Sequence, residues 1–304
     1  MNRFILALSC YSTRGIIAAV SSYLAANGCN IIDSSQFDDL ETEKFFMRVT
    51  FISQEGATLQ KLSKGFTNIR KKFTMQASFH DEYERMKVII MVSRFGHCLN
   101  DLLYRWRIGV LPIDIAGVVS NHLDYRKAVI DHHVPFYHIN MAKETKHEAE
   151  QKLWGIIRKN GVDLIVLARY MQVLSEKLCH KMEGRIINIH HSFLPSFKGA
   201  NPYKQAYQRG VKLIGATAHY ATTDLDEGPI IEQDVARITH AQNTDDYIAI
   251  GRDIEIQVLA RAVHAHIQHR TFINANRVVV FPITPGSYTL KKEKDQVPYL
   301  SNTV

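Results

Sequence analysis

Five short apolar runs dominate the chain from Met86 onward. They read MKVIIMVS, IDIAGVVS, VPFYHI, VDLIVLA and RIINIH, and begin at Met86, Ile113, Val134, Val162 and Arg185. An apolar run with almost no alternation is typical of a strand buried on both faces of a parallel sheet. Segments of helix length separate the runs, so this part of the chain is predicted to form a Rossmann-like parallel α/β domain.

The first 84 residues have a different pattern. The runs RFILALSC, NIIDSSQFDD, KFFMRVTFIS and MQASFHDEY read as strands, and apolar residues at helical spacing follow the first and third of them. Ser12 or Thr13 is expected to cap the first helix. The order βαββαβ predicts a ferredoxin-like domain over residues 1–84. Residues 85–304 are expected to form the second domain, with residues 281–304 as an extended tail.

Composition narrows the cellular setting. The four cysteines are scattered without a C-x-x-C pair, which favours a reducing, cytoplasmic compartment over a disulfide framework or a thiolate zinc site. Apolar runs are too short to span a bilayer, and the N-terminus does not resemble a signal peptide. The net charge of +7 suits several anionic partners. Because no long Lys/Arg block is present, neither nucleic acid nor a membrane is an expected partner.

Three polar residues at the end of the fifth run and in a later loop offer acyl chemistry. In parallel α/β sheets, ligands bind beyond the carboxyl ends of the strands, where Asn188 and His190 lie. Two positions apart on a strand, they share one face. Asp226 comes from the Gly-Pro-bounded loop TTDLDEGPII. An amide donor, an imidazole and a carboxylate are the parts needed to add a nucleophile to a carbonyl carbon, so we predict these three as catalytic.

Other interpretations of these residues stay open from the pattern alone. Asn188 could cap the strand, and His190 could satisfy a buried backbone group. A metal ion could be held by His190, His191, His219 and Asp226, although adjacent histidines diverge on a strand and no H-E-x-x-H pair is present. Ser192 lacks the G-x-S-x-G context of a serine nucleophile. The loop SRFGHCLND has one glycine rather than the G-x-G-x-x-G pattern, which argues against a dinucleotide-binding site.

Two longer segments carry a family resemblance. The segment NIHHSFLPSFKGANPYKQAYQRGVKLIGATAHYATTDLDEGPIIEQDV resembles the catalytic core of formyltetrahydrofolate deformylases, which are similar in fold to glycinamide ribonucleotide formyltransferase. The N-terminal unit with RGIIAAVSSYLAANGCNI resembles their ACT domain. The resemblance extends from about Arg3 to about Phe281. It implies an ACT-like regulatory domain followed by a formyltransferase-like catalytic domain.

The resemblance also implies an activity and a set of site residues. It implies hydrolysis of 10-formyltetrahydrofolate to formate and tetrahydrofolate, in one-carbon metabolism that supplies formate for purine biosynthesis, with no cofactor and no metal. The implied catalytic positions are Asn188, His190 and Asp226. The implied folate-contacting positions form two loops, namely Met171, Gln172, Val173 and Leu174 in one, and Thr222, Thr223, Asp224 and Leu225 in the other.

The chain departs from the related transferases at two places. Their motif histidine is followed by proline, whereas this chain has His191, and their phosphate loop G-S-N is replaced by Gly96-His97-Cys98. Both departures favour water as the formyl acceptor. Formyl transfer to glycinamide ribonucleotide and a non-catalytic ACT-type ligand sensor remain the alternatives. ACT units commonly pair, so a homo-oligomer, dimer or tetramer, is expected.

Overall fold

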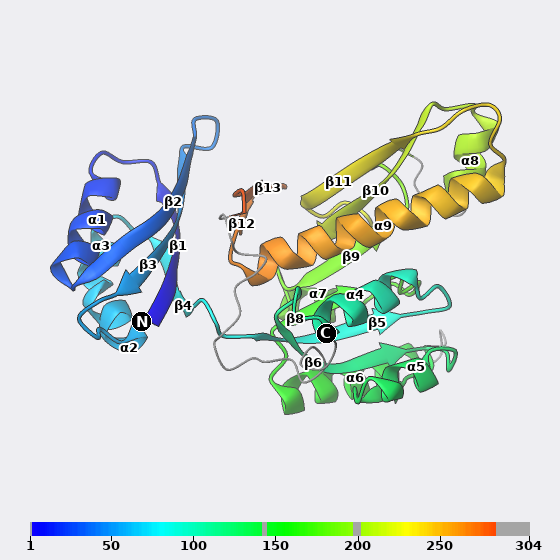
Figure 1. Ribbon diagram of the computed structural model, residues 1–304, viewed down its shortest axis with the longest axis horizontal. Coiled ribbons are helices and arrows are strands. Elements are labelled where there is room, and N and C mark those ends of the chain that lie inside the picture. The colour runs from blue at the N-terminus through cyan, green and yellow to red at the C-terminus, as the bar shows by residue number, and fades with distance from the viewer. Residues whose placement is uncertain (1, 142–144, 197–201, 284–304) are drawn as a thin grey trace, which may run out of the picture. The chain divides into compact units, whose positions relative to one another are not determined.

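The computed structural model describes residues 2–141, 145–196 and 202–283, and these fall into two compact units (Figure 1). The first unit comprises residues up to Glu84, together with residues 265–274 and the residues from Val278. The second comprises residues 85–264 and 275–277. The expected tail at 281–304 lies outside the described residues from position 284 onward. In the described part, no helix combines the length and apolarity that crossing a bilayer requires.

The first unit is built on a four-stranded antiparallel sheet in the order β2-β3-β1-β4. Its strands are β1 (Asn2–Tyr11), β2 (Cys29–Asp39), β3 (Lys44–Ser53) and β4 (Gln76–Asp81). Helix α1 (Ile16–Ala26) connects β1 to β2, and α2 (Leu59–Gly65) with α3 (Thr67–Lys72) connects β3 to β4. This is the ferredoxin-like order expected from the sequence.

Helix α1 begins differently from the prediction. Gly15 occupies the N-cap with a φ of 96°, and no side chain caps the helix. Ser12 instead donates a hydrogen bond to Asp38 of β2 over 2.7 Å, so the predicted Ser12 or Thr13 cap is wrong. A left-handed backbone at Gly15 turns the chain into the helix without a side-chain oxygen, which is a conformation that glycine adopts readily.

The two faces of the first sheet are buried by different segments. Alternate residues such as Leu6, Val49 and Phe51 share a core with Val20 of α1 and Leu62 of α2. On the opposite face, Phe46 packs edge-on against Phe272, with ring centroids 5.8 Å apart. Arg48 donates to the carbonyl of Gln268 over 3.0 Å. Residues 268–274 therefore pack on this sheet, although they had been expected to belong to the second domain.

The second unit contains a seven-stranded sheet in the order β11-β10-β9-β8-β5-β6-β7. Five parallel strands correspond to the apolar runs of the sequence: β5 (Met86–Val92), β6 (Ile113–Ser120), β7 (Phe136–His138), β8 (Leu164–Leu167) and β9 (Ile186–His190). Two antiparallel strands, β10 (Leu213–Tyr220) and β11 (Ile230–Arg237), extend the sheet beyond β9. The mixed sheet keeps the parallel centre that the sequence predicts.

Helices cover the central strands of this sheet. These are α4 (His97–Arg107), α5 (Arg126–Asp131), α6 (Lys146–Asn160), α7 (Glu176–Lys181), α8 (Pro202–Gln208) and α9 (Thr244–Ile267). Helices α6 and α7 contribute Leu153 and Leu178 to one core with Ile89 and Ile165 of the sheet. A short two-stranded sheet, β12 (Thr271–Asn274) and β13 (Arg277–Val280), follows α9. In the order of the seven-stranded sheet, β9 lies between β8 and β10.

Candidate active site

Strand β9 ends with two of the predicted catalytic residues. Its antiparallel pairing with β10 sets Asn188 opposite His219 and His190 opposite Thr217. Residues two apart on a strand point to the same face, so the Asn188 and His190 side chains lie on the same side of the sheet as His219. The register between two strands therefore adds a second histidine to the site.

Asp226 reaches the site from the loop between β10 and β11. Its backbone is left-handed, with a φ of 58°, a conformation that aspartate tolerates better than most residues. Two residues later, Gly228 is buried so close to β10 that a Cβ there would overlap the Tyr220 carbonyl oxygen. Tyr220 also donates its amide to the carbonyl of Pro229. The loop is thus held against the end of β10, with the Asp226 carboxylate turned toward the histidines.

The carboxylate of Asp226 lies between two imidazoles. Its Oδ1 is 3.2 Å from Nδ1 of His190 and 3.7 Å from Nε2 of His219. The three side chains are largely buried, with exposed fractions of 13%, 6% and 2% for Asp226, His190 and His219. Nε2 of His190 is buried and has no hydrogen-bond partner among the described residues. That nitrogen is therefore the one available to a substrate.

His219 orients the Asn188 amide. Nδ1 of His219 lies 3.0 Å from the carbonyl oxygen of Tyr220, which can only accept, so this nitrogen carries the proton in the neutral ring. Nε2 is then an acceptor for the Asn188 amide nitrogen, 3.1 Å away. The amide keeps its second N–H for another acceptor. Asn188 can consequently donate to an oxygen in the site while His219 holds its orientation.

The charge state of Asp226 follows from its neighbours. Burial raises the pKa of the carboxyl group, but the interactions with the His190 and His219 rings outweigh burial and hold the pKa well below its usual range. Asp226 is therefore an anion throughout the physiological pH range. In this position it can accept a hydrogen bond from Nδ1 of His190.

The two residues after His190 have other environments. The His191 ring is tilted from the His190 ring, with centroids 5.2 Å apart, and burial together with the Arg169 charge lowers its pKa to about 3, so His191 is neutral. Ser192 is buried and donates to the carbonyl of Ser196 over 2.9 Å. Within the described residues its hydroxyl donates to this carbonyl rather than to a base of the kind that a serine nucleophile needs.

The two predicted folate loops differ in how their side chains are used. Leu174 is buried in the core with Leu178, so only its backbone is available to a ligand. Large apolar side chains are exposed on both loops, with exposed fractions of 54% for Met171 and Val173 and 64% for Leu225. The remaining residues, Gln172, Thr222, Thr223 and Asp224, are intermediate or exposed, and Thr222 donates to the Asp224 carbonyl. Exposed apolar residues on these loops suit a planar ring system.

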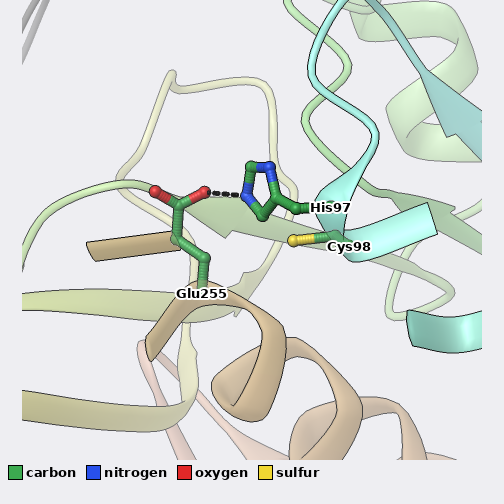
Figure 2. A group of neighbouring side chains, drawn as sticks. All are labelled: His97, Cys98 and Glu255. Atoms are coloured by element: carbon green, nitrogen blue, oxygen red, sulfur yellow. Dashed lines mark hydrogen bonds and ion pairs between the residues drawn. The ribbon is translucent and has the colours of Figure 1, made fainter. Parts of the chain in front are cut away.

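A second buried cluster lies at the start of α4. Figure 2 shows the Glu255 carboxylate from α9 facing the His97 ring, with Cys98 beside it. The distance from His97 Nε2 to the carboxylate is 2.7 Å, and the ligand atoms of the three residues lie within 4.8 Å of one another. In the described part of the chain, this is the set of side chains whose spacing suits a metal ion, whereas the predicted alternative of His190, His191, His219 and Asp226 is not such a set.

Sequence analysis did not identify all of these functional residues. His219 was considered only as a metal ligand, and its position opposite Asn188 required the register of β10 with β9. Glu255, Arg169 and Tyr203 were not singled out at all. The one available signal was Arg169, a charged residue directly after a buried apolar run. The contact of Glu255 with His97 spans 158 positions and has no local signature.

Comparisons with known proteins agree with this architecture. The ACT domain family model matches residues 4–64, and the formyl transferase family model matches residues 86–263. A formyltetrahydrofolate deformylase from Corynebacterium sp. (strain P-1) is 46% identical, covering 91% of this chain and 98% of its own. The one from Escherichia coli (strain K12) is 37% identical, covering 92% and 99%.

Solved structures show the same relationship. The formyltetrahydrofolate deformylase from Burkholderia mallei superimposes with a TM-score of 0.90 at 47% identity, covering 93% of this chain and 100% of its own. Glycinamide ribonucleotide transformylase 1 from Symbiobacterium toebii reaches a TM-score of 0.62 at 28% identity and covers 65% of this chain and 95% of its own. The likeness to the deformylases extends over both domains and that to the transformylase over a smaller share, so the chain belongs to the formyltetrahydrofolate deformylase family.

Proposed function

We propose that this chain hydrolyses 10-formyltetrahydrofolate to formate and tetrahydrofolate. The observation that carries the proposal is the buried arrangement of Asp226, His190 and Asn188, with His190 Nε2 and one Asn188 N–H available to a substrate oxygen. The family relationship supplies the substrate class. The reaction adds water to the formyl carbon and then breaks its bond to N10.

Asp226, His190 and Asn188 have separate roles in the reaction. The Asp226 carboxylate accepts a proton from water as the water oxygen bonds to the formyl carbon. The formyl oxygen gains negative charge and accepts hydrogen bonds from His190 Nε2–H and from the Asn188 amide. The carbon–N10 bond then breaks, and the proton held by Asp226 passes to N10. Tetrahydrofolate and formic acid result, and the formic acid releases the second proton of the water to give formate.

The low pKa of Asp226 has two opposite consequences. It keeps the carboxylate ionised, so that the carboxylate can accept a hydrogen bond from His190 Nδ1 and orient the ring toward the formyl group. It also makes Asp226 a weaker proton acceptor than a base with a pKa near neutrality. The proposal therefore gives the larger share of the rate enhancement to stabilisation of the oxyanion by His190 and Asn188.

Binding of the folate is assigned to the two loops that flank these residues. Met171, Val173 and Leu225 offer exposed apolar surface to the ring system, and backbone groups of residues 171–174 and 222–225 supply hydrogen bonds. We further propose that the enzyme acts without cofactor or metal, in the cytoplasm, as a dimer or tetramer. Its formate would supply purine biosynthesis.

One assay tests the function. Purified protein is given 10-formyltetrahydrofolate with and without glycinamide ribonucleotide, and formate is measured. A deformylase releases formate without the acceptor, a transferase requires the acceptor and formylates it, and a ligand sensor releases none. Loss of activity to a chelator and its recovery with zinc would contradict the metal-free mechanism.

A further inference from the structure

The seven-stranded sheet has its topological switch point between β5 and β8. The chain leaves β5 toward β6 and β7 on one side and returns to β8 on the other. In open α/β sheets, ligands bind in the crevice beyond such a point. Here the two strand ends meet directly, because Ser93 donates its amide to the Arg169 carbonyl over 3.2 Å. Helix α4 starts four residues after Ser93, and its N-terminus favours an anion.

The anion at this place is a side chain of the protein. Glu255 of α9 is buried, with 1% of its side chain exposed, and its Oε2 lies 2.7 Å from Nε2 of His97, the first residue of α4 (Figure 2). Tyr203 donates to Oε1 over 2.6 Å. The amide of Gly96, the N-cap of α4, donates to the Tyr125 hydroxyl over 2.8 Å. Side chains of the chain thus occupy the donors that an external anion would use.

Arg169 supplies a positive charge beside Glu255. Its side chain is nine-tenths buried, and its Nε is 3.5 Å from Glu255 Oε2. Nη1 of Arg169 is buried and has no hydrogen-bond partner among the described residues. Its backbone is left-handed, with a φ of 64°, which is unusual for a residue with a long side chain. A buried guanidinium with unused donors beside a helix N-terminus is an arrangement that binds anions.

This cluster adjoins the active site through aromatic contacts. The His191 ring lies 5.2 Å from the His190 ring and 6.2 Å from the Tyr203 ring, centroid to centroid. Tyr203 in turn holds Glu255. A second substrate bound at the start of α4 would therefore lie beside His190.

We infer that Glu255 is an internal carboxylate that fills an anion subsite at the switch point, so that no phosphate-bearing or carboxylate-bearing acceptor binds next to the folate and the formyl group is left to water. Glu255 is in this sense a specificity-determining residue. The inference rests on the proposed deformylase function for its meaning, but the occupied subsite is a property that binding measurements can test alone.

The same cluster is a poor site for a cation. Burial and the Glu255 charge raise the pKa of the Cys98 thiol well above its usual value, so it is protonated at neutral pH and cannot act as a thiolate ligand. The Arg169 guanidinium already lies beside the carboxylate. A divalent metal ion would have to displace that charge.

The test compares the full-length protein with its Glu255→Ala variant in phosphate and in chloride at equal ionic strength. Removing the carboxylate leaves the Arg169 guanidinium and the His97 ring, at the start of α4, free for phosphate. At phosphate about tenfold above its dissociation constant, we expect the thermal midpoint of the variant to rise by about 3 °C or more. The wild-type midpoint should differ by less than about 1 °C between the two salts. Phosphate should also inhibit formate release by the variant but not by the wild type.

Asp101→Ala is the matched control. It removes a carboxylate 2.6 Å from Arg105 on the same helix, where the pair is partly exposed to solvent, and it should show no response specific to phosphate. If Glu255→Ala does not fold, Glu255→Gln removes the charge and keeps the volume. Its midpoint should still rise in phosphate, because Arg169 has lost its counter-charge. The rise should be smaller than that of Glu255→Ala, because glutamine still fills the space of the carboxylate.

Several outcomes would overturn the inference. These are equal phosphate responses of wild type and variant, no response of either Glu255 variant, or a response of Asp101→Ala as large as theirs. Stabilisation of the wild type by stoichiometric zinc, lost in Glu255→Ala, would make the cluster a metal site. A variant that binds phosphate without inhibition would remove the specificity role. Since the thermal measurements need no turnover, a protein that releases no formate would refute only the proposed function.

Discussion

His190 and Asp226 lie 3.2 Å apart, Nδ1 to Oδ1, although one ends the buried strand β9 and the other sits in the loop that follows the next strand, β10. The pair leaves Nε2 of His190 for the substrate and keeps the carboxylate ionised. Its geometry makes both side chains indispensable to the proposed hydrolysis, for different reasons.

Replacement of Asp226 by asparagine should remove the base and keep the shape of the loop. We expect kcat to fall by about 10²- to 10⁴-fold, with KM for the folate within a few-fold of wild type. Formate release measures both constants. Asp253→Asn, an exposed carboxylate on α9 with no part in the proposed site, is the control and should be nearly normal. Near-normal turnover of Asp226→Asn would remove this residue from the mechanism.

Replacement of His190 by alanine should remove the donor to the formyl oxygen. Loss of one such donor costs about 2.7 to 4 kcal/mol, so kcat should fall by about 10²- to 10³-fold. The exposed His240→Ala serves as the control for a lost imidazole elsewhere in the unit. If His190→Ala kept kcat and raised only KM, the imidazole would bind the substrate rather than stabilise the transition state.

Asn188→Leu should remove the amide donor and keep a side chain of similar shape, because leucine has the same number and branching of side-chain heavy atoms as asparagine, although its methyl groups are bulkier. The variant also leaves Nε2 of His219 without its partner. We expect a loss in kcat of about 10²-fold with the folded structure retained. Circular dichroism checks the fold, and single-turnover formate release checks the chemical step. A leucine variant with wild-type kcat would show that His190 alone supplies the oxyanion contact.

Gly228→Ala should displace the loop that carries Asp226. A Cβ at this position would overlap the carbonyl oxygen of Tyr220, which is backbone and cannot move aside cheaply. We expect a fall in kcat of about tenfold or more together with a lower thermal midpoint. Gly155→Ala in α6 is the control, since nothing lies within 4 Å of its added Cβ and alanine favours helix by about 1 kcal/mol. Unchanged kcat in Gly228→Ala would show that the loop position is not critical.

The first unit should lose stability on mild acidification. His80 stacks on His269, ring centroids 3.5 Å apart, and burial lowers the pKa of His80 to about 4. The unfolded chain binds that proton near pH 6.5, so between these values the unfolded state holds more protons. Stability therefore falls as the pH falls from 6.5 toward 4, by up to about 1.4 kcal/mol per pH unit for this proton.

The measurement must report on the first unit alone. Both tryptophans, Trp106 and Trp154, belong to the second unit, so hydrogen exchange of β1 and β4 amides is the suitable probe. Wild type should open more readily at pH 5 than at pH 7.5 after correction for intrinsic exchange. His80→Phe keeps a ring at this position and should flatten the dependence. An equal slope in both proteins would place the titrating group elsewhere.

The local sequence pattern predicted much of this fold. The five apolar runs became the parallel strands of the second sheet, and the βαββαβ order became the first sheet. The sequence pattern predicted the ends of helices and the breaks within them less well. The helical spacing of Leu59, Leu62, Phe66, Ile69 and Phe73 predicts one continuous second helix in the first domain, but the helix divides after Gly65 into α2 and α3. Glycine is a poor helix former.

The sequence by itself determined which residues end the central strands and which loop brings a carboxylate, because strand period and turn residues are written in neighbouring positions. Only the tertiary structure decided that Asp226 meets His190, that His219 faces Asn188, and that Glu255 fills the place beside His97. Those contacts depend on strand register and on a helix far along the chain. Register and long-range packing are fixed by the whole core, so no short stretch of sequence encodes them.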